Sequence, residues 1–329
     1  NARARSNARR GARAMSVQAV VLANCGAEGG GGLELVSACR GAPALLPVGT
    51  VPLVEYALRA LGGLRVESPV LLLVGGAAAA QRLGEHVAAL AADEWPGGAR
   101  PEVVALPEGV GSAEALRHVS DRLTAKAVVV LSAEAILGAP LREVLAMHVA
   151  REATLSAVFA RKAKATAKDA KAKQPAPSDY VGLPAPKGAK AGTSNALEPQ
   201  AQLIFAAAGH SAATGGGEGG ESAAPAGLTE LRLRRVACRA AGAMRLRADL
   251  FDARCHVLSR DALALIEAKP GIKGLREDLV PYLARHQSDA GFPASLLAAV
   301  HRKAAAAAGG KDGGVEGAAG GGTDGGEGG

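Results

Sequence analysis

The chain has 329 residues, which is enough for one large domain or two ordinary ones, and its hydrophobic content of 48% supports a globular core. Aromatic residues make up only 2% and there are 44 glycines, which indicates low-complexity segments mixed into a folded domain. The net charge is +7, but few aromatics interleave with the basic residues, so a stacking surface for single-stranded nucleic acid is disfavoured.

Neither a membrane span nor a cysteine-based scaffold is indicated. No run of about 18 apolar residues is present. The four cysteines, which form no Cys-x-x-Cys pair, fit a reduced cytosolic protein better than a disulfide scaffold or a zinc site. Residues 1–15 form a basic extension that we expect to be disordered. It has the composition of a transit peptide, but Met15 directly precedes the first predicted strand, which favours a translated upstream extension.

After Met15 the pattern alternates between short apolar runs and amphipathic segments. The predicted strands are 17–23, 69–74, 102–106, 127–131 and 154–160. The predicted helices are 52–61, 77–92, 112–123 (with Ser112 as its N-cap) and 140–150. This order predicts an α/β, Rossmann-like fold with a mostly parallel mixed sheet and helices on both faces. Ligands of such sheets bind at the carboxyl ends of the strands, here near Gly26 and residues 132–134.

The second half of the chain is interrupted. Residues 161–178 and about 186–227 are low-complexity insertions that we expect to be disordered. Strand fragments are predicted at 179–183 and 203–205, further structure at 228–236 and 244–258, and helices at 261–268 and 275–286. We therefore expect one folded domain over 16–290, followed by an Ala/Gly-rich disordered tail over 291–329.

Residues 44–61, ALLPVGTVPLVEYALRAL, resemble the block that follows the nucleotide-binding loop of sugar-nucleotide pyrophosphorylases. The resemblance implies a nucleotidyltransferase fold. Members of that family hold phosphates with an arginine and two lysines around this block. Leu33, Pro43 and Val51 stand at the matching positions and carry no charge, although Arg40 lies nearby. The sequence thus predicts the scaffold without its phosphate-binding charges.

Two acidic residues and a glycine-serine pair are candidates for remnants of the nucleotide pocket. Residues 128–134, VVVLSAE, resemble the strand that ends in a Mg²⁺-binding Gly-Asp pair, with Glu134 in place of the aspartate. Asp252 is a candidate second metal carboxylate. Residues 111–116, GSAEAL, resemble a motif whose backbone contacts the nucleotide base, but a helix start alone explains the same residues. The predicted vestigial pocket comprises Gly26, Gly111, Ser112, Glu134 and Asp252; no catalytic residue, metal ligand or cofactor is expected.

Read together, the distant segments resemble the gamma subunits of eukaryotic translation initiation factor 2B. The most specific element is LREDLVPYLARHQ at 275–287. The resemblance implies a non-catalytic, pyrophosphorylase-like domain in the cytosolic complex that exchanges GDP for GTP on initiation factor 2. The implied partners are the epsilon subunit, the other subunits of the complex and initiation factor 2, with neither nucleic acid nor membrane contacted directly. Such subunits also carry a C-terminal β-helix of hexapeptide repeats, which these 329 residues do not contain.

Two other functions remain open from the sequence. One is an active sugar-1-phosphate nucleotidyltransferase, for example a mannose-1-phosphate guanylyltransferase, which the fold, the 44–61 block, Glu134 and Asp252 favour. The other is a nucleotide sensor without turnover, which the glycine-rich loop and GSAEAL favour.

Overall fold

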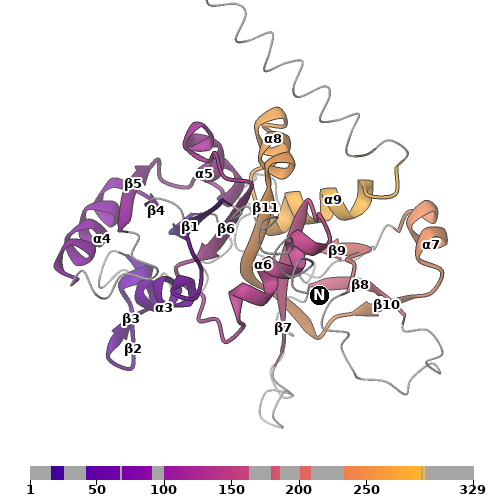
Figure 1. Ribbon diagram of the computed structural model, residues 1–329, viewed down its shortest axis with the longest axis horizontal. Coiled ribbons are helices and arrows are strands. Elements are labelled where there is room, and N and C mark those ends of the chain that lie inside the picture. Colours follow the sequence, from indigo (N-terminus) through magenta and orange to yellow (C-terminus); the bar gives the residue numbers. More distant parts are fainter. Residues whose placement is uncertain are drawn as a thin grey trace, which may run out of the picture.

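A six-stranded mixed sheet forms the centre of the computed structural model, which describes residues 16–25, 42–66, 69–90, 100–162, 179–185, 201–208, 233–289 and 292 (Figure 1). The strand order is β5-β4-β1-β6-β11-β7. The bounds are β1 Val17–Ala23, β4 Val70–Gly75, β5 Pro101–Leu106, β6 Ala127–Ser132, β7 Leu155–Arg161 and β11 Leu250–Ser259. The first four strands in this order are parallel, and β11 runs antiparallel to both β6 and β7. The predicted α/β fold with a mostly parallel sheet is confirmed.

The inner strands consist almost entirely of buried apolar residues. All six residues of β4 are buried, as are six of the seven in β1. Continuous apolar runs of this kind are typical of parallel strands that are covered on both faces. In β1, Val20 pairs with Leu71 on one side and with Val130 on the other, so β1 lies in the middle of the sheet.

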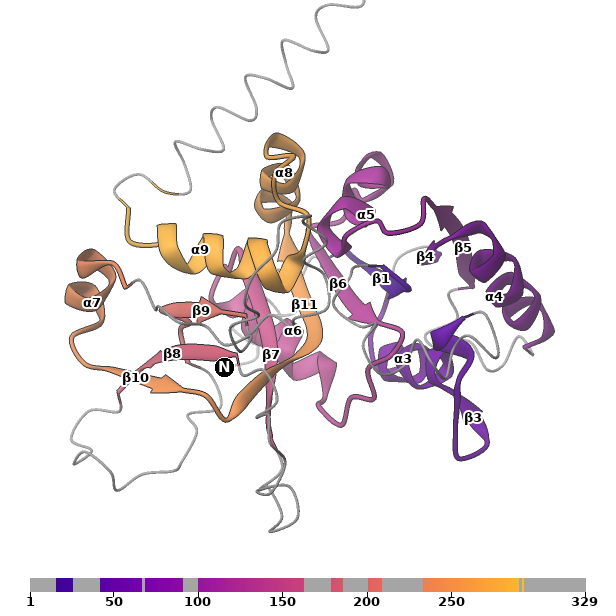
Figure 2. The same ribbon diagram turned by 180° about the vertical axis from the view of Figure 1, so that it is seen from behind.

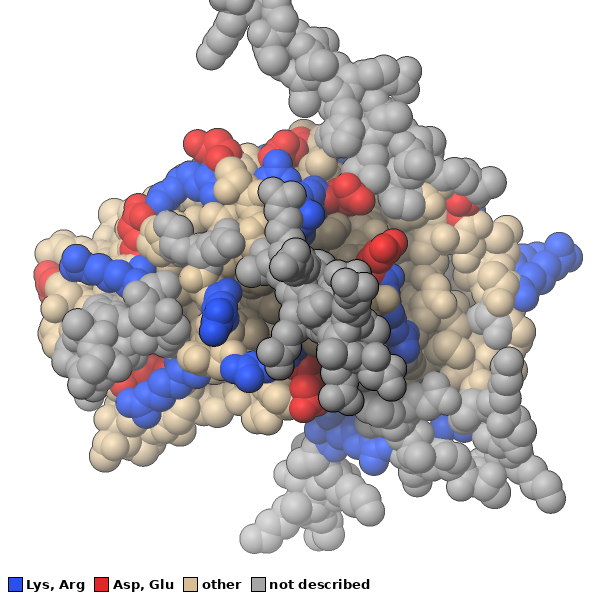
Figure 3. Space-filling model, viewed as in Figure 1, with Lys and Arg blue, Asp and Glu red and all other residues tan. Residues whose placement is uncertain are grey.

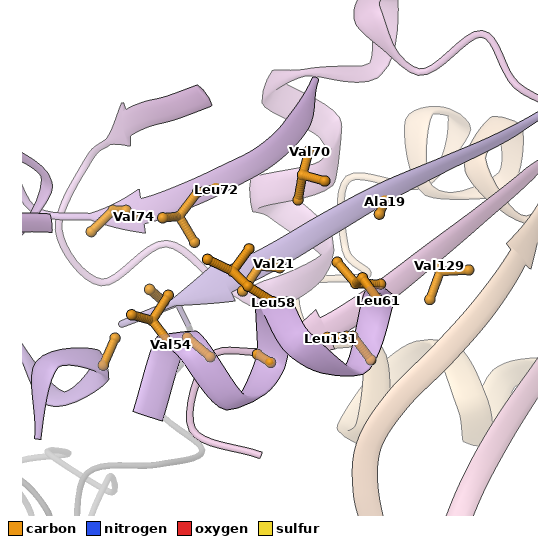
Figure 4. Packing of buried hydrophobic residues seen from close by; sticks show 14 of the residues in the cluster. Ala19, Val21, Val54, Leu58, Leu61, Val70, Leu72, Val74, Val129 and Leu131 are labelled. Atoms are coloured by element: carbon orange, nitrogen blue, oxygen red, sulfur yellow. The ribbon is translucent and has the colours of Figure 1, made fainter. Parts of the chain in front are cut away.

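Helices cover both faces of this sheet. One face carries α3 (Leu53–Leu61), α4 (Ala77–Ala89) and α6 (Leu141–Ala150). Figure 4 shows Val54, Leu58 and Leu61 of α3 pointing at side chains of the central strands. The other face carries α5 (Ser112–His118), α8 (Arg260–Ala268) and the segment 275–286. Burying one such leucine side chain contributes about 1.5–3 kcal/mol, so the apolar stripes of these helices account for their position.

Two predicted helices differ in detail from the structure. The helix predicted over 112–123 is α5 followed by a short 3-10 helix at Ser120–Arg122, and its N-cap is Gly111. The prediction of Ser112 as the N-cap was wrong, because Ser112 lies within the first turn and its hydroxyl bonds elsewhere. The last helix begins as a π-helix, η8 (Leu275–Leu279), and continues as α9 (Val280–His286). Pro281 lacks the N–H that would complete an α-helical bond at this point, which is consistent with the widened turn before it.

A smaller antiparallel sheet lies beside the edge of the main one. Its order is β10-β8-β9, with β8 at Tyr180–Pro184, β9 at Phe205–Ala207 and β10 at Met244–Arg247. Helix α7 (Arg235–Ala241) precedes β10, and α9 packs next to β9 (Figure 2). The segment predicted over 244–258 is therefore two strands in different sheets. Residues 1–15, most of the two insertions and nearly all of the tail lie outside the described residues.

The 44–61 block forms a short 3-10 helix, η2 (Pro43–Leu45), then a hairpin of β2 (Pro47–Val48) and β3 (Val51–Pro52), and then α3. Gly49 has a φ of 65° in the hairpin turn, a conformation that favours glycine. Ala44 and Leu53 on either side of the hairpin are buried. Gly49 and the buried apolar residues of this block thus have positions that the scaffold requires.

Charged side chains are interspersed on the face of the molecule seen in Figure 3, where blue and red groups alternate without a continuous basic track over the described surface. Within the described ranges, no helix combines the length and the apolar character needed to cross a membrane.

Candidate functional site

The carboxyl ends of β1 and β6 meet where the strand order reverses, which is where open α/β sheets bind ligands. A small cavity of about 30 Å³ lies at this position, with room for roughly one water molecule. Its lining is drawn from β1, β6, β11 and two helix starts: Leu22, Cys25, Ser112, Val130, Ser132, Arg254, His256, Leu275 and Arg276. Of the predicted pocket residues, Gly26 lies outside the described residues, and Ser112 lines this cavity directly.

A bulge in β11 shapes one wall of the site. Asp252 is paired with Phe159 of β7, and His256 is paired with Ala157. Between these two pairs β11 advances by four residues while β7 advances by two, so β11 carries two extra residues here. Arg254, between them, adopts a left-handed φ of 55°. In a regular strand, residues four apart stand about 13 Å apart. The bulge instead brings the Asp252 Oδ2 and His256 Nε2 atoms to 2.9 Å.

The Asp252 carboxylate is buried, and both of its oxygens have partners within this bulge. Its Oδ1 accepts the backbone N–H of Arg254 at 2.7 Å, and its Oδ2 contacts His256. Burial raises the pKa of Asp252, but His256, the Arg254 N–H and Arg276 together outweigh burial and hold that pKa below its ordinary value. The carboxylate that was a candidate remnant of a metal site is thus an ionised acid whose oxygens already have partners.

Glu134 lies just beyond β6 and forms an ion pair with Arg254, with Oε2 and Nη1 3.2 Å apart. Burial raises the pKa of Glu134 above its ordinary value, and Arg254 offsets only part of this effect. The same glutamate contributes to the raised pKa of the nearby Cys25 thiol, about 11, for which burial is the main cause. The two candidate remnant carboxylates, Glu134 and Asp252, therefore each face a basic side chain of the same strand, β11. Among the described residues, no three His, Cys, Asp or Glu side chains are grouped so that they could hold a metal ion.

A second ion pair borders the site. Arg276, the second residue of η8, bonds to both oxygens of the buried Asp179, at 2.5 and 3.3 Å. The Asp179 carboxylate also accepts the backbone N–H of Asp252 at 3.4 Å. Asp179, directly before β8, thus links the β11 bulge and the start of η8 into one polar network.

The GSAEAL motif meets a different part of the chain from the one its resemblance implies. The N–H groups of Ala113 and Glu114 both donate to the carbonyl of Lys273, at 2.8 and 3.2 Å. The Ser112 hydroxyl accepts the N–H of Leu275 at 2.8 Å. A Cβ on Gly111 would stand 2.4 Å from the Lys273 oxygen, so only glycine admits this contact. Two backbone donors at the start of α5, the N–H groups of Ala113 and Glu114, are therefore occupied by the protein's own Lys273.

Arg117 completes the attachment of this segment. Its guanidinium donates to three carbonyls at the end of α8 and in the loop that follows: Ile266 at 3.0 Å, Lys269 at 3.1 Å and Ile272 at 2.8 Å. Asp278 then accepts the N–H groups of Lys273 and Gly274, both at 2.8 Å. Two of the motifs that carry sequence resemblances, GSAEAL and LREDLVPYL, are thus in direct contact with each other.

The positions where lysines would be needed to bind phosphate are apolar in the structure as well. Pro43 begins η2, and Val51 is half-buried in the hairpin, where it pairs with Val48. Leu33 and Arg40 lie outside the described residues. Within the described part of this block, neither position offers a cation to a phosphate.

Sequence reasoning missed several residues of the site, above all Arg254, His256 and Arg276. His256 follows Asp252 by four residues, a spacing that carries no meaning in a regular strand and becomes a contact only through the bulge. Arg276 lay inside the LREDLVPYL motif, but its partner Asp179 is 97 residues away in the chain. Neither contact leaves a local signal that could have been found.

Comparison with known proteins agrees with this geometry at the level of the fold. Residues 28–169 match the family model for nucleotidyl transferases. None of the curated proteins searched matches the chain. The chain thus contains a nucleotidyltransferase-like domain, and its sheet extends beyond the matched residues at both ends.

Proposed function

We propose that this chain is a non-catalytic subunit of the initiation factor 2B complex, where it supports guanine-nucleotide exchange on initiation factor 2 together with the epsilon subunit in the cytosol. The observation that carries the non-catalytic part is the contact between GSAEAL and the 273–275 segment. At this helix start the N–H groups of Ala113 and Glu114 already bond to Lys273 and are not available to a nucleotide base. The assignment to the exchange factor rests on the resemblance of residues 275–287.

The charge arrangement supports the same proposal. Phosphoryl transfer needs cations on the phosphates and carboxylates on Mg²⁺. Pro43 and Val51 cannot supply the cations. Glu134 must break its ion pair with Arg254, and Asp252 its contact with His256, before either carboxylate binds a metal. Because these groups are buried or half-buried, leaving Arg254 or His256 without its partner costs free energy.

Co-purification tests the assignment. The full chain, tagged and expressed in eukaryotic cells, should recover an epsilon subunit and initiation factor 2 from the lysate. The purified complex should release GDP from initiation factor 2 faster than the same complex lacking this chain. Recovery of the chain as a lone monomer, or exchange that does not depend on it, would count against the proposal.

The alternative, an active sugar-1-phosphate nucleotidyltransferase, is favoured by the family match over 28–169 and by the acidic Glu134 at the end of β6. Pyrophosphate release from GTP or UTP with several sugar 1-phosphates tests this alternative. Our proposal expects no turnover above buffer. Sustained turnover that Glu134→Ala abolishes and the exposed-site control Glu143→Ala retains would replace the proposed subunit with an enzyme.

A further inference from the structure

A large cavity lies away from the candidate site, beside the edge strand β7. Its volume is about 460 Å³, within the range of small-molecule pockets. Its walls come from β7 and its preceding loop, the end of α6, the 201–203 segment and α9, which runs along this side of the molecule in Figure 2. None of the residues that the sequence or the fold assigns to a nucleotide pocket lines it.

The cavity presents polar and apolar surface in similar amounts, and its apolar side chains lie on two elements. Val280, Leu283 and Ala284 of α9 form one wall, and Leu155, Ala157 and Phe159 of β7 form the other. The α9 residues are buried, whereas these three β7 residues are half-exposed because they face the cavity. The volume between the two walls therefore suits an apolar body such as an aromatic ring or an alkyl chain.

Three polar side chains of the lining are already bonded within the protein. Gln287 donates to the Leu203 carbonyl at 2.6 Å and accepts from Gln202 at 2.9 Å, which fixes the 201–203 segment onto α9. The Ser156 hydroxyl bonds to the buried His148 at 3.0 Å. These contacts hold the 201–203 segment and β7 in place beside the cavity.

Arg151 differs from these three side chains. It is exposed at the end of α6, it lines the cavity, and its guanidinium has no carboxylate partner among the residues that the structure describes. Of the described side chains that line the cavity, none is an Asp or a Glu. A single cation beside an apolar volume matches a ligand with one negative charge, since a doubly charged phosphate would keep one charge uncompensated.

We propose that this cavity binds a small amphipathic carboxylate, with the apolar body between β7 and α9 and the carboxylate on Arg151. The site is independent of the proposed subunit function, so the failure of either leaves the other standing.

Methyl NMR provides a direct test, because Met147 lines this cavity whereas Met244 lies elsewhere, in β10. The full chain, labelled at the methionine methyls, is titrated with 4-phenylbutyrate and separately with the uncharged 4-phenylbutanol. We expect 4-phenylbutyrate to shift the Met147 signal in a saturable manner and to leave Met244 in place. The Met147→Leu variant assigns the signal.

Three variants complete the test, each checked for an unchanged thermal unfolding midpoint. Arg151→Gln should weaken 4-phenylbutyrate binding about tenfold or more and leave 4-phenylbutanol binding unchanged, and Ala153→Trp, which fills the cavity, should weaken both. The exposed control Arg100→Gln should change neither. The proposal is overturned if Met147 does not respond at millimolar 4-phenylbutyrate, or if Arg151→Gln binds both compounds as the unsubstituted chain does.

Discussion

Arg117 illustrates how a single side chain fastens distant parts of this fold. It lies on α5, yet its three hydrogen bonds all go to carbonyls between residues 266 and 272, about 150 positions further along the chain. Those carbonyls belong to the end of α8 and the loop after it, where a helix has no intrahelical donors to offer. Arg117 satisfies them with one rigid, charged group.

We expect Arg117→Met to lower the free energy of unfolding by about 3 kcal/mol, because three partly buried carbonyls lose charged donors. Urea denaturation followed by circular dichroism measures the effect. Arg122→Met is the matched control, since Arg122 pairs with Glu102 at an exposed position and such pairs contribute only about 0–1 kcal/mol. Equal losses for the two variants would contradict the role given to Arg117.

His148 makes stability depend on pH. Burial lowers the pKa of His148 below its ordinary value of 6.5, and its Nδ1 bonds to Ser156. Below pH 6.5 the unfolded chain therefore binds a proton that the folded chain does not, so stability falls as the pH is lowered and is retained above that value.

The expected result is that the stability difference between the unsubstituted chain and His148→Gln shrinks from pH 7 to pH 5, by up to about 1.4 kcal/mol per pH unit. Urea titrations at several pH values measure it. Val149→Gln, at the neighbouring exposed position, should keep the full pH dependence. A difference that stays constant across this range would show that His148 titrates alike in both states.

At the scale of elements, the decisive contact is between the start of α5 and the segment that begins η8. The Lys273 carbonyl fits there because Gly111 has no Cβ. Gly111→Ala places a methyl group 2.4 Å from that oxygen, which is backbone and cannot rotate aside. The 273–275 segment must then shift away from α5.

This shift should cost about 1–3 kcal/mol and should speed hydrogen exchange at the Leu275 amide, which now bonds to Ser112. Gly84→Ala is the control. Gly84 lies inside α4 with open space around it, and alanine there should stabilise the helix by about 0.5–1 kcal/mol. Unchanged Leu275 exchange in Gly111→Ala would contradict the proposed contact.

The elements themselves were largely predictable, because local patterns determine them. The apolar runs of β1 and β4 and the amphipathic period of α3 each occur within ten residues or fewer. The site was less predictable, because its contacts join residues far apart in sequence. Three features of the site depend on the packing of β11 and η8 against β6 and α5: the Arg254 bulge, the Lys273 contact and the Arg276–Asp179 pair. No local sequence pattern predicts this packing.

At the scale of the whole molecule, the matched residues 28–169 do not make up a complete sheet. They omit β1, which separates β4 from β6, and β11, which separates β6 from β7. The residues that the sheet shares with the known family are thus held together by strands from outside the match.

We therefore predict that a fragment of residues 28–169 does not fold, whereas residues 16–292 do. The fragment should lack a cooperative unfolding transition and should bind a hydrophobic dye. Without β1 and β11, the apolar side chains of β4, β6 and β7 and of the helices that pack on them are exposed to solvent. Differential scanning calorimetry and dye fluorescence compare the two. A fragment with a sharp calorimetric transition would contradict the central role of those strands.

The place of β11 between β6 and β7 also affects the nascent chain. About one hundred residues separate the end of β7 from the end of β11, which at roughly 5–20 residues per second takes a ribosome about 5 to 20 s. During that interval β6 and β7 have both been made, and the strand that joins them has not. Two unpaired strand edges on a nascent chain are sites where chaperones bind or aggregation begins, so conditions that slow translation after residue 161 should lower the yield of this protein more than its final stability would suggest.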